Sequence, residues 1–124
     1  MNQKIMLVDL SKCTACRGCQ VACKNWNGLP AERTQNTGSY QNPVDLSPTT
    51  YTLIRFQEID DKENTIKWLF RNDKCFHCTD AGCMKVCPVP GCITKSPSGA
   101  IILDSKKCIG CKYCYHACPF SIPR

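Results

Sequence analysis

Twelve of the thirteen cysteines fall into three short runs, and these side chains are the ones whose type and spacing could do chemistry. The first and third runs share the spacing C-x2-C-x2-C-x3-C, and the second has two more residues between its second and third cysteines. The runs consist of Cys13, Cys16, Cys19 and Cys23, of Cys75, Cys78, Cys83 and Cys87, and of Cys108, Cys111, Cys114 and Cys118. Thiolates at such short spacing are ligands for soft metals. We therefore expect metal or redox chemistry at the three runs.

Pro119 directly follows Cys118, which gives the third run the bacterial 4Fe-4S ferredoxin pattern. In that pattern three cysteines ligate one cluster and the fourth ligates a different one. Crossed ligation then predicts two ligand groups. These are Cys75, Cys78 and Cys83 with Cys118, and Cys108, Cys111 and Cys114 with Cys87. The expected fold is α+β, a bacterial ferredoxin-like domain that binds several 4Fe-4S clusters and has little regular secondary structure.

Two other uses of cysteine fit the sequence less well. Structural zinc sites draw two separated cysteine pairs into one tetrahedron, whereas four cysteines crowd each run here. Disulfides need an oxidising compartment, and cysteines two residues apart seldom reach bridging geometry. The thirteenth cysteine, Cys92, lies outside the runs. We interpret Cys92 as a bystander thiol, with a role as a replacement cluster ligand as the alternative.

An internal repeat shows how the runs are positioned. Residues 7–23 align without a gap on residues 102–118, and the match includes Asp9 with Asp104 and Lys12 with Lys107. Each copy predicts a short strand, a turn, a tight cysteine loop and the first turn of a helix. Before the third run, this strand is expected over residues 100–103.

A cysteine-free insertion, residues 24–72, separates the first run from the second. Residues 25–50 are rich in Asn, Pro, Gly, Ser and Thr and predict an ordered loop. Residues 51–59 and 65–70 are rich in β-branched and aromatic residues around the polar stretch 60–64, which predicts a β-hairpin. We treat residues 1–124 as one ferredoxin-like iron-sulfur domain that carries this insertion.

The formal net charge of +6 does not indicate a nucleic-acid partner. Each oxidised 4Fe-4S cluster with four thiolates carries about −2, so three clusters would roughly cancel that charge. The basic residues are also scattered, mostly beside the cysteine runs. No stretch approaches the roughly 20 apolar residues of a membrane span, so we expect none.

Other side chains are assigned structural roles. We expect His77 to donate a hydrogen bond that supports the backbone, rather than to bind metal, and His116 to lie on a helix face. Trp26, Trp68 and Phe70 are interpreted as core or cluster-shielding aromatics. The sequence contains no Ser-His-Asp arrangement, P-loop or dinucleotide-binding fingerprint, so we predict no catalytic residue.

Several motifs resemble the iron-sulfur (beta) subunit of molybdenum- or tungsten-dependent formate dehydrogenases. The motifs outside the first run are KNW at 24–26, NTG at 36–38, QNP at 41–43, DLS at 45–47, LIRF at 53–56, WLF at 68–70 and CPFSIPR at 118–124. The resemblance covers nearly the whole chain.

This resemblance implies a non-catalytic subunit that relays electrons through 4Fe-4S clusters. The electrons would come from a large molybdopterin catalytic subunit that oxidises formate, and would pass to a cytochrome, a quinone-linked subunit or another acceptor. The alternatives are the same role in another molybdopterin oxidoreductase or hydrogenase-linked complex, or a free-standing ferredoxin. Such enzymes are often exported folded, which makes the periplasm the expected location and the cytoplasm the alternative. Arg17 or Lys112 is expected to tune the neighbouring cluster.

The resemblance also implies a fourth cysteine run downstream, and residues 1–124 do not contain it. That run would complete the cluster begun by Cys13, Cys16 and Cys19, and Cys23 would ligate a fourth cluster. We therefore expect three clusters, or four if a C-terminal segment is missing.

Overall fold

The computed structural model describes residues 3–60 and 65–124. Residues 61–64, within the predicted hairpin turn, lie outside the described residues. The chain forms two compact units, Val8–Lys74 and the combination of Met1–Leu7 with Cys75–Arg124. No helix in the described ranges has the length and apolar character needed to cross a membrane.

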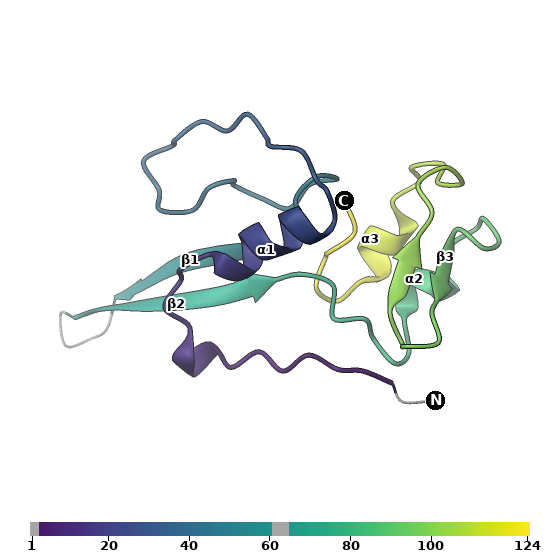
Figure 1. Ribbon diagram of the computed structural model, residues 1–124, viewed down its shortest axis with the longest axis horizontal. Helices are drawn as coiled ribbons and strands as arrows, with labels where there is room; N and C mark the ends of the chain where they lie inside the picture. Colours follow the sequence, from purple (N-terminus) through teal and green to yellow (C-terminus); the bar gives the residue numbers. More distant parts are fainter. Residues whose placement is uncertain (1–2, 61–64) are drawn as a thin grey trace. The chain divides into compact units, whose positions relative to one another are not determined.

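The predicted hairpin is confirmed in the first unit. Strands β1 (Leu53–Asp60) and β2 (Ile66–Asp73) pair antiparallel, with Leu53 opposite Asp73 (Figure 1). Leu53 and Ile54 are buried at the start of β1, and Asn72 and Asp73 are buried at the end of β2. The core of this unit therefore lies at the end of the hairpin from which the chain continues to the second cysteine run.

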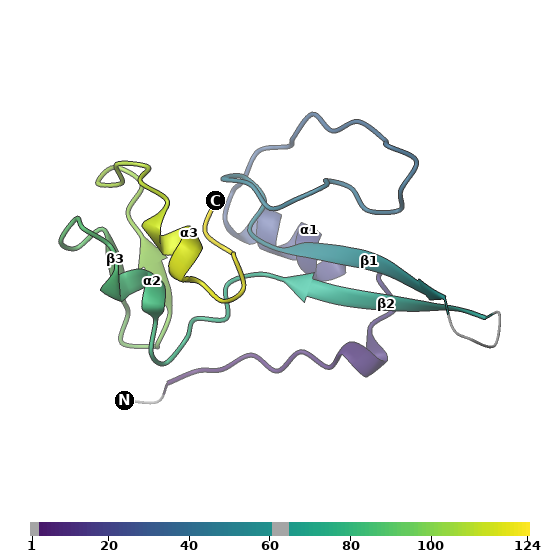
Figure 2. The same ribbon diagram turned by 180° about the vertical axis from the view of Figure 1, so that it is seen from behind.

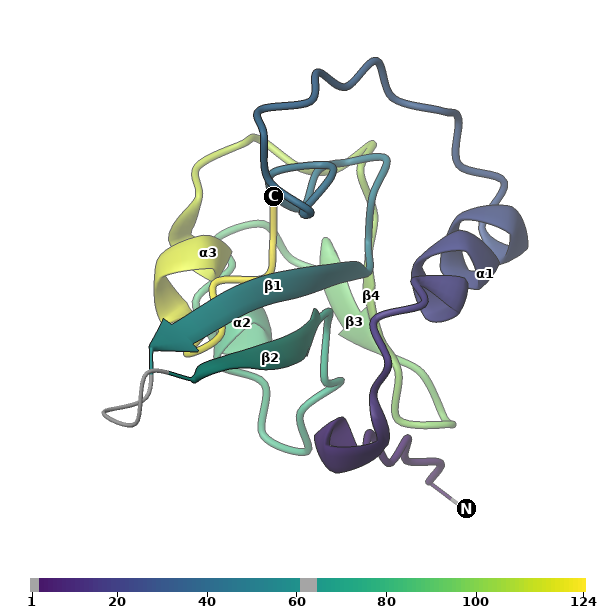
Figure 3. The ribbon, with the colours of Figure 1, turned by 90° about the vertical axis from the view of Figure 1, so that its left-hand side faces the viewer.

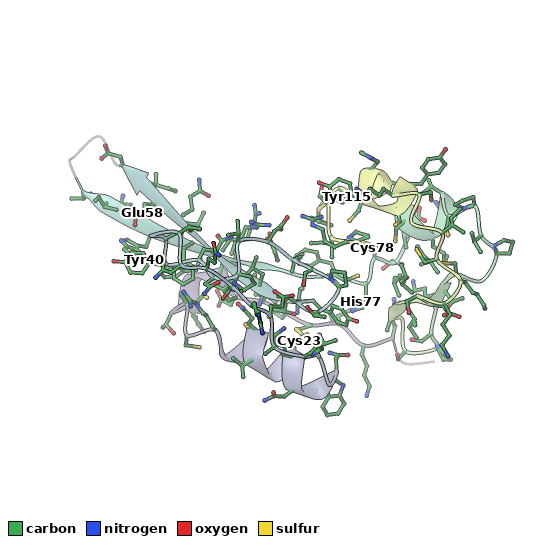
Figure 4. The ribbon with its side chains drawn as sticks, turned by 90° about the horizontal axis from the view of Figure 1, so that it is seen from above. Cys23, Tyr40, Glu58, His77, Cys78 and Tyr115 are labelled. Carbon is green, nitrogen blue, oxygen red and sulfur yellow. The ribbon has the colours of Figure 1, made fainter. Side chains whose placement is uncertain are left out.

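Aromatic side chains cover one face of the hairpin. Phe56 and Phe70 are direct partners in the register, and their ring centroids lie 5.3 Å apart. Trp68 lies 6.1 Å from Phe70 and 4.9 Å from Tyr40, which comes from the preceding loop. Figure 4 shows Tyr40 beside the strands and Glu58 farther along β1. Alternation of side chains along a strand places this group on a single face.

Helix α1 (Gly18–Trp26) carries the end of the first cysteine run. The strand predicted before this run is wrong, because residues 3–9 form no strand and Leu10–Lys12 form a short 3-10 helix, η1. The reason is local: the Asp9 carboxylate accepts a hydrogen bond from the Ser11 N–H at 3.0 Å and caps a helical turn. Such short-range bonds compete with extended backbone.

The loop predicted over residues 25–50 is confirmed over residues 27–50, whereas Asn25 and Trp26 belong to α1; the loop arcs from α1 back to β1 (Figure 2). The Lys24 ammonium closes it by donating to the carbonyls of Pro30 at 2.9 Å and Thr49 at 2.7 Å. The Glu32 carboxylate accepts hydrogen bonds from the hydroxyls of Ser47 and Thr49. These bonds hold the pKa of Glu32 below its ordinary value. Polar side chains therefore order a segment that has almost no regular structure.

The second unit contains a small antiparallel pair of strands and two short helices. Strand β4 (Ile101–Leu103) confirms the predicted strand, and β3 (Ile93–Lys95), which pairs with it, was not predicted. Helix α2 (Gly82–Lys85) contacts both β3 and helix α3 (Tyr113–Ala117) (Figure 3). A Cβ atom at Gly82 would lie 3.0 Å from the Ala117 carbonyl oxygen. Glycine at this position lets the two helices approach closely.

Candidate metal centres

The three cysteine runs share a backbone conformation as well as a spacing. The residue before the second cysteine is left-handed in every run, with φ values of 55° at Ala15, 49° at His77 and 72° at Gly110. Arg17 and Lys112, at equivalent places before α1 and α3, have φ values of 60° and 61°. A non-glycine residue in this region costs about 1–2 kcal/mol. The sequence repeat is therefore a repeat of structure, in which a tight loop leads into a helix.

Backbone N–H groups point at sulfur in two of these loops. The N–H of His77 donates to the Cys75 Sγ at 3.4 Å, and the N–H of Gly110 donates to the Cys108 Sγ at 3.4 Å. Both donors lie two residues after the cysteine, so the left-handed loop itself creates the contact. Hydrogen bonds of this kind stabilise a thiolate and raise the potential of a cluster bound to it.

One pocket joins the second run to the third. Its lining includes the five thiols of Cys87, Cys92, Cys108, Cys111 and Cys114 and the apolar side chains of Val89, Ile93 and Leu103. Cys87 ends the second run, whereas Cys108, Cys111 and Cys114 begin the third. The pocket thus gathers the four cysteines that crossed ligation places on one cluster. Thiolates in an apolar surrounding are a donor set that fits a 4Fe-4S cluster.

A second group of thiols forms around Cys83 in α2. Burial raises the pKa of this thiol, and the nearby thiols of Cys75 and Cys118 raise it further. Phe76 and Phe120, which lie close to these two cysteines in sequence, are in contact, with ring centroids 4.6 Å apart and ring planes tilted by 50°. The end of the third run therefore lies beside the second run, as crossed ligation requires.

The first run receives hydrogen bonds from two asparagine side chains. Asn72 donates from Nδ2 to the Cys19 Sγ at 3.3 Å. Asn27 donates to the Cys23 Sγ at 3.6 Å and to the Cys23 carbonyl at 2.8 Å. Figure 4 shows Cys23 on α1. Neither asparagine was predicted. Asn27 lies four residues after Cys23, one turn further along the chain, whereas Asn72 lies 53 positions from Cys19 and no spacing rule connects the two.

Cys92 is buried, with 2% of its surface exposed. Its Sγ lies 3.6 Å from the Asp104 carbonyl, to which the thiol donates. Burial raises the pKa of Cys92 to about 11, and the neighbouring Cys87 and Cys108 add to the shift. Among the described residues, no three His, Cys, Asp or Glu side chains gather as around a single ion. The ligand assignments and the bystander role of Cys92 stay predictions.

Three predictions outside the runs have different outcomes. His116 lies in α3, as predicted. His77 supports the backbone, but as an acceptor rather than a donor, since its Nδ1 receives the Ile101 N–H at 3.0 Å. The core role for Trp26 is wrong, because this residue ends α1, a helix with no buried residue, and is 90% exposed; the alternative role in shielding a cluster stays a prediction.

Two family models of a 4Fe-4S dicluster domain match the sequence, one over residues 12–92 and the other over residues 66–124. The chain belongs to the 4Fe-4S dicluster domain family. Each matched range contains two cysteine runs, and the two ranges share the second run. The family match therefore supports 4Fe-4S clusters as the groups that the cysteine runs bind.

Curated relatives of this dicluster chain confirm the resemblance seen in its motifs. It is 45% identical to a formate dehydrogenase iron-sulfur subunit of Haemophilus influenzae over 95% of its own length and 38% of the relative. It is 44% identical to the formate dehydrogenase-O iron-sulfur subunit of Escherichia coli over 95% of its length and 39% of the relative. It is 40% identical to the formate dehydrogenase 2 subunit beta (cytochrome c-553) of Nitratidesulfovibrio vulgaris over 98% of its length and 58% of the relative. The chain spans about two fifths of the first two relatives.

Proposed function

We propose that this dicluster chain is the electron-transfer part of a formate dehydrogenase iron-sulfur subunit. The observation that carries the proposal is the grouping of thiols from different runs, with Cys87 beside Cys108, Cys111 and Cys114, and Cys118 beside Cys83. The similarity to formate dehydrogenase iron-sulfur subunits supports the choice of enzyme. When bound, the clusters supply one-electron transfer. The protein contributes ligands, insulation from water and hydrogen bonds to sulfur.

The proposed ligands follow the two groups. Cys75, Cys78, Cys83 and Cys118 hold one cluster, and Cys87, Cys108, Cys111 and Cys114 hold another. Cys13, Cys16 and Cys19 hold a third, for which the fourth ligand lies outside their loop. Cys23 ligates a fourth cluster together with residues of a further segment. Residues 24–72 are, in this proposal, an insertion into a single iron-sulfur domain.

The proposed electron donor is a large catalytic subunit that carries molybdopterin with molybdenum or tungsten and oxidises formate. The proposed acceptor is a cytochrome or a quinone-linked subunit. Exposed Val21 and Trp26 on α1 support a docked subunit, because apolar surface of this kind is buried in stable complexes. Co-export with the catalytic subunit would place the chain in the periplasm.

The crossed ligand groups are tested by single Cys→Ser variants purified without oxygen. Iron and acid-labile sulfide per chain are measured, with the intact mass taken from the same sample. Replacement of Cys87 or Cys118 is expected to remove or alter one cluster each, although each lies in a different run from its three partners. Cys92→Ser is the matched control and is expected to keep the full iron content.

Two outcomes would contradict this proposal. Wild-type protein without iron and sulfide would exclude clusters altogether. Unchanged spectra in Cys118→Ser would exclude crossed ligation while leaving clusters in place. Formate-dependent reduction of the clusters in the purified complex, with no reduction by sulfite, would assign the enzyme.

A further inference from the structure

Asn72 reaches the first cysteine run from the insertion. It is the last residue but one of β2, and only 9% of its surface is exposed. Its Nδ2 donates to the Cys19 Sγ at 3.3 Å, within the range for a hydrogen bond to sulfur. Its Oδ1 is buried and has no partner among the described residues. A buried amide oxygen without a partner is costly, so this orientation needs a compensating bond.

The contact with sulfur is the bond that fixes the orientation of the amide. If the Asn72 amide were rotated by 180°, its oxygen would face the Cys19 sulfur; with Cys19 as a thiolate ligand, two electron-rich atoms without a proton between them would then be in contact. The buried atom without a partner would then be the NH2 group, which carries two donors. The orientation with nitrogen toward sulfur is therefore the favourable one when Cys19 is a thiolate ligand.

The backbone around Asn72 is held firmly in register with α1. Asn72 lies opposite Ile54 in the hairpin, and the Ile54 N–H donates to the Gln20 Oε1 at 3.3 Å. Gln20 is the residue after Cys19, so a single rung of the hairpin makes two contacts with the first turn of α1. Ile54 is 2% exposed, which leaves this rung little room to move.

We propose that Asn72 is a positioning residue that orients Cys19 and raises the reduction potential of the cluster bound to the first run. This inference rests on the proposed function, since it assumes that Cys19 is a ligand. Reduction adds negative charge to the cluster and its sulfurs, so an N–H bond to sulfur is stronger in the reduced state. A donor at Cys19 therefore stabilises the reduced form and raises the potential.

The source of the hydrogen bond distinguishes this run from the other two. Cys75 and Cys108 accept from backbone N–H groups of their own loops, which only a substitution to proline would remove. Cys19 accepts from a side chain that lies 53 positions further along the sequence. The insertion can therefore adjust the potential at the first run without changing the cysteine loop.

The test is the midpoint potential of each cluster in the complete subunit complex, followed by EPR during a redox titration. Asn72→Leu keeps the approximate size and removes the donor. We expect the oxidised-to-reduced ratio of one cluster to rise about tenfold at a fixed poise, a fall of about 59 mV in midpoint for a one-electron couple. The other clusters are the internal control. Asn25→Leu, a change at an exposed position of α1, is expected to move none of them.

The outcomes separate this inference from the proposed function. Full iron content with every midpoint unmoved in Asn72→Leu overturns the role of Asn72 and leaves the electron-transfer proposal intact. Wild-type protein without clusters overturns both. Should Asn72→Leu fail to fold, Asn72→Asp has the shape of the native side chain. In Asn72→Asp the midpoint potential of the cluster at the first run is expected to fall below the wild-type value by more than about 59 mV, or that cluster alone is expected to be lost. An unchanged midpoint potential in Asn72→Asp also overturns the inference.

Discussion

Asp73 joins two arginines that face each other across the hairpin. Arg55 and Arg71 are direct partners in the register, an arrangement that is unfavourable for like charges. The Asp73 carboxylate accepts hydrogen bonds from both, including one from the Arg71 Nε at 2.7 Å. Burial on its own would raise the pKa of Asp73, but the bonds from Arg71 and Arg55 outweigh it and lower the pKa. The carboxylate is thus fully ionised at neutral pH.

Asp73→Asn is expected to destabilise the hairpin by roughly 3 kcal/mol. A hydrogen bond between charged groups contributes about 1.5–3 kcal/mol, and the Asp73 side chain is only 11% exposed. The Arg71 side chain is 61% exposed, so its bond to Asp73 contributes an energy at the low end of this range, because solvent screens the charges. Loss of the Asp73 carboxylate also leaves the guanidinium groups of Arg55 and Arg71 opposed, and Arg55 then keeps only its ion pair with Asp45.

Hydrogen exchange of the β1 and β2 amides at neutral pH measures this local stability. Each 1.4 kcal/mol corresponds to a factor of ten, so Asp73→Asn should accelerate exchange roughly a hundredfold. Asp60→Asn, at an exposed position of the same hairpin, is the matched control and should change it little. In an Arg71→Gln background the effect of Asp73→Asn should shrink, because the opposed charge is gone.

Acceleration below threefold in Asp73→Asn would refute the assignment of Asp73 as a bridge between the arginines. Strict additivity with Arg71→Gln would refute the repulsion between them. The lowered pKa of Asp73 also determines how the stability of the folded state changes with pH. A carboxyl group with a lowered pKa in the folded state stabilises the protein above the ordinary pKa of about 3.9, and this contribution is lost as the pH falls through the folded-state pKa.

Two further predictions concern the first and second cysteine loops. The Arg17 guanidinium lies 4.8 Å from the centroid of the Phe56 ring and donates to a loop carbonyl, so Arg17→Met should speed limited proteolysis of residues 27–50 about fivefold. Arg33 lies within residues 27–50 and has no such ring contact among the described residues, so Arg33→Met should leave the rate of proteolysis unchanged. Equal rates in the two variants would contradict the role of Arg17 in holding this loop. His77→Phe removes the acceptor for the Ile101 N–H and should speed exchange of that amide about tenfold, whereas His77→Asn should restore part of the protection. An unchanged rate in His77→Phe would show that the Ile101 amide is protected by other means.

Much of this molecule was predictable wherever local chemistry decides the structure. The gapless repeat predicted the similar loops before α1 and α3, and β-rich residues around a polar turn predicted the hairpin. The same repeat failed before the first run. There Asp9 caps a 3-10 turn, whereas the equivalent residues before the third run form β4, which has β3 as its partner. A β-strand needs a second strand to pair with, and an internal repeat does not indicate whether that second strand is present.

The hydrogen bond from Asn72 to the first run could not be predicted from the sequence for a different reason. Asn72 and Cys19 are brought together by the hairpin register and by the packing of α1, and neither feature can be recognised from the amino-acid types alone. Trp26 shows the converse case, since its size predicted burial but its place at the end of an exposed helix did not allow it. Contacts between segments far apart in the sequence could therefore not be predicted from the sequence.

The close approach of Gly82 to Ala117 has a consequence for biosynthesis. Each of these residues directly precedes a cysteine, so the contact brings Cys83 and Cys118 together from positions 35 residues apart in sequence. A ribosome releases Cys118 only after it has made the whole second run. In the proposed ligand group of Cys75, Cys78, Cys83 and Cys118, the cluster can therefore gain its fourth ligand only after the third run has been synthesised.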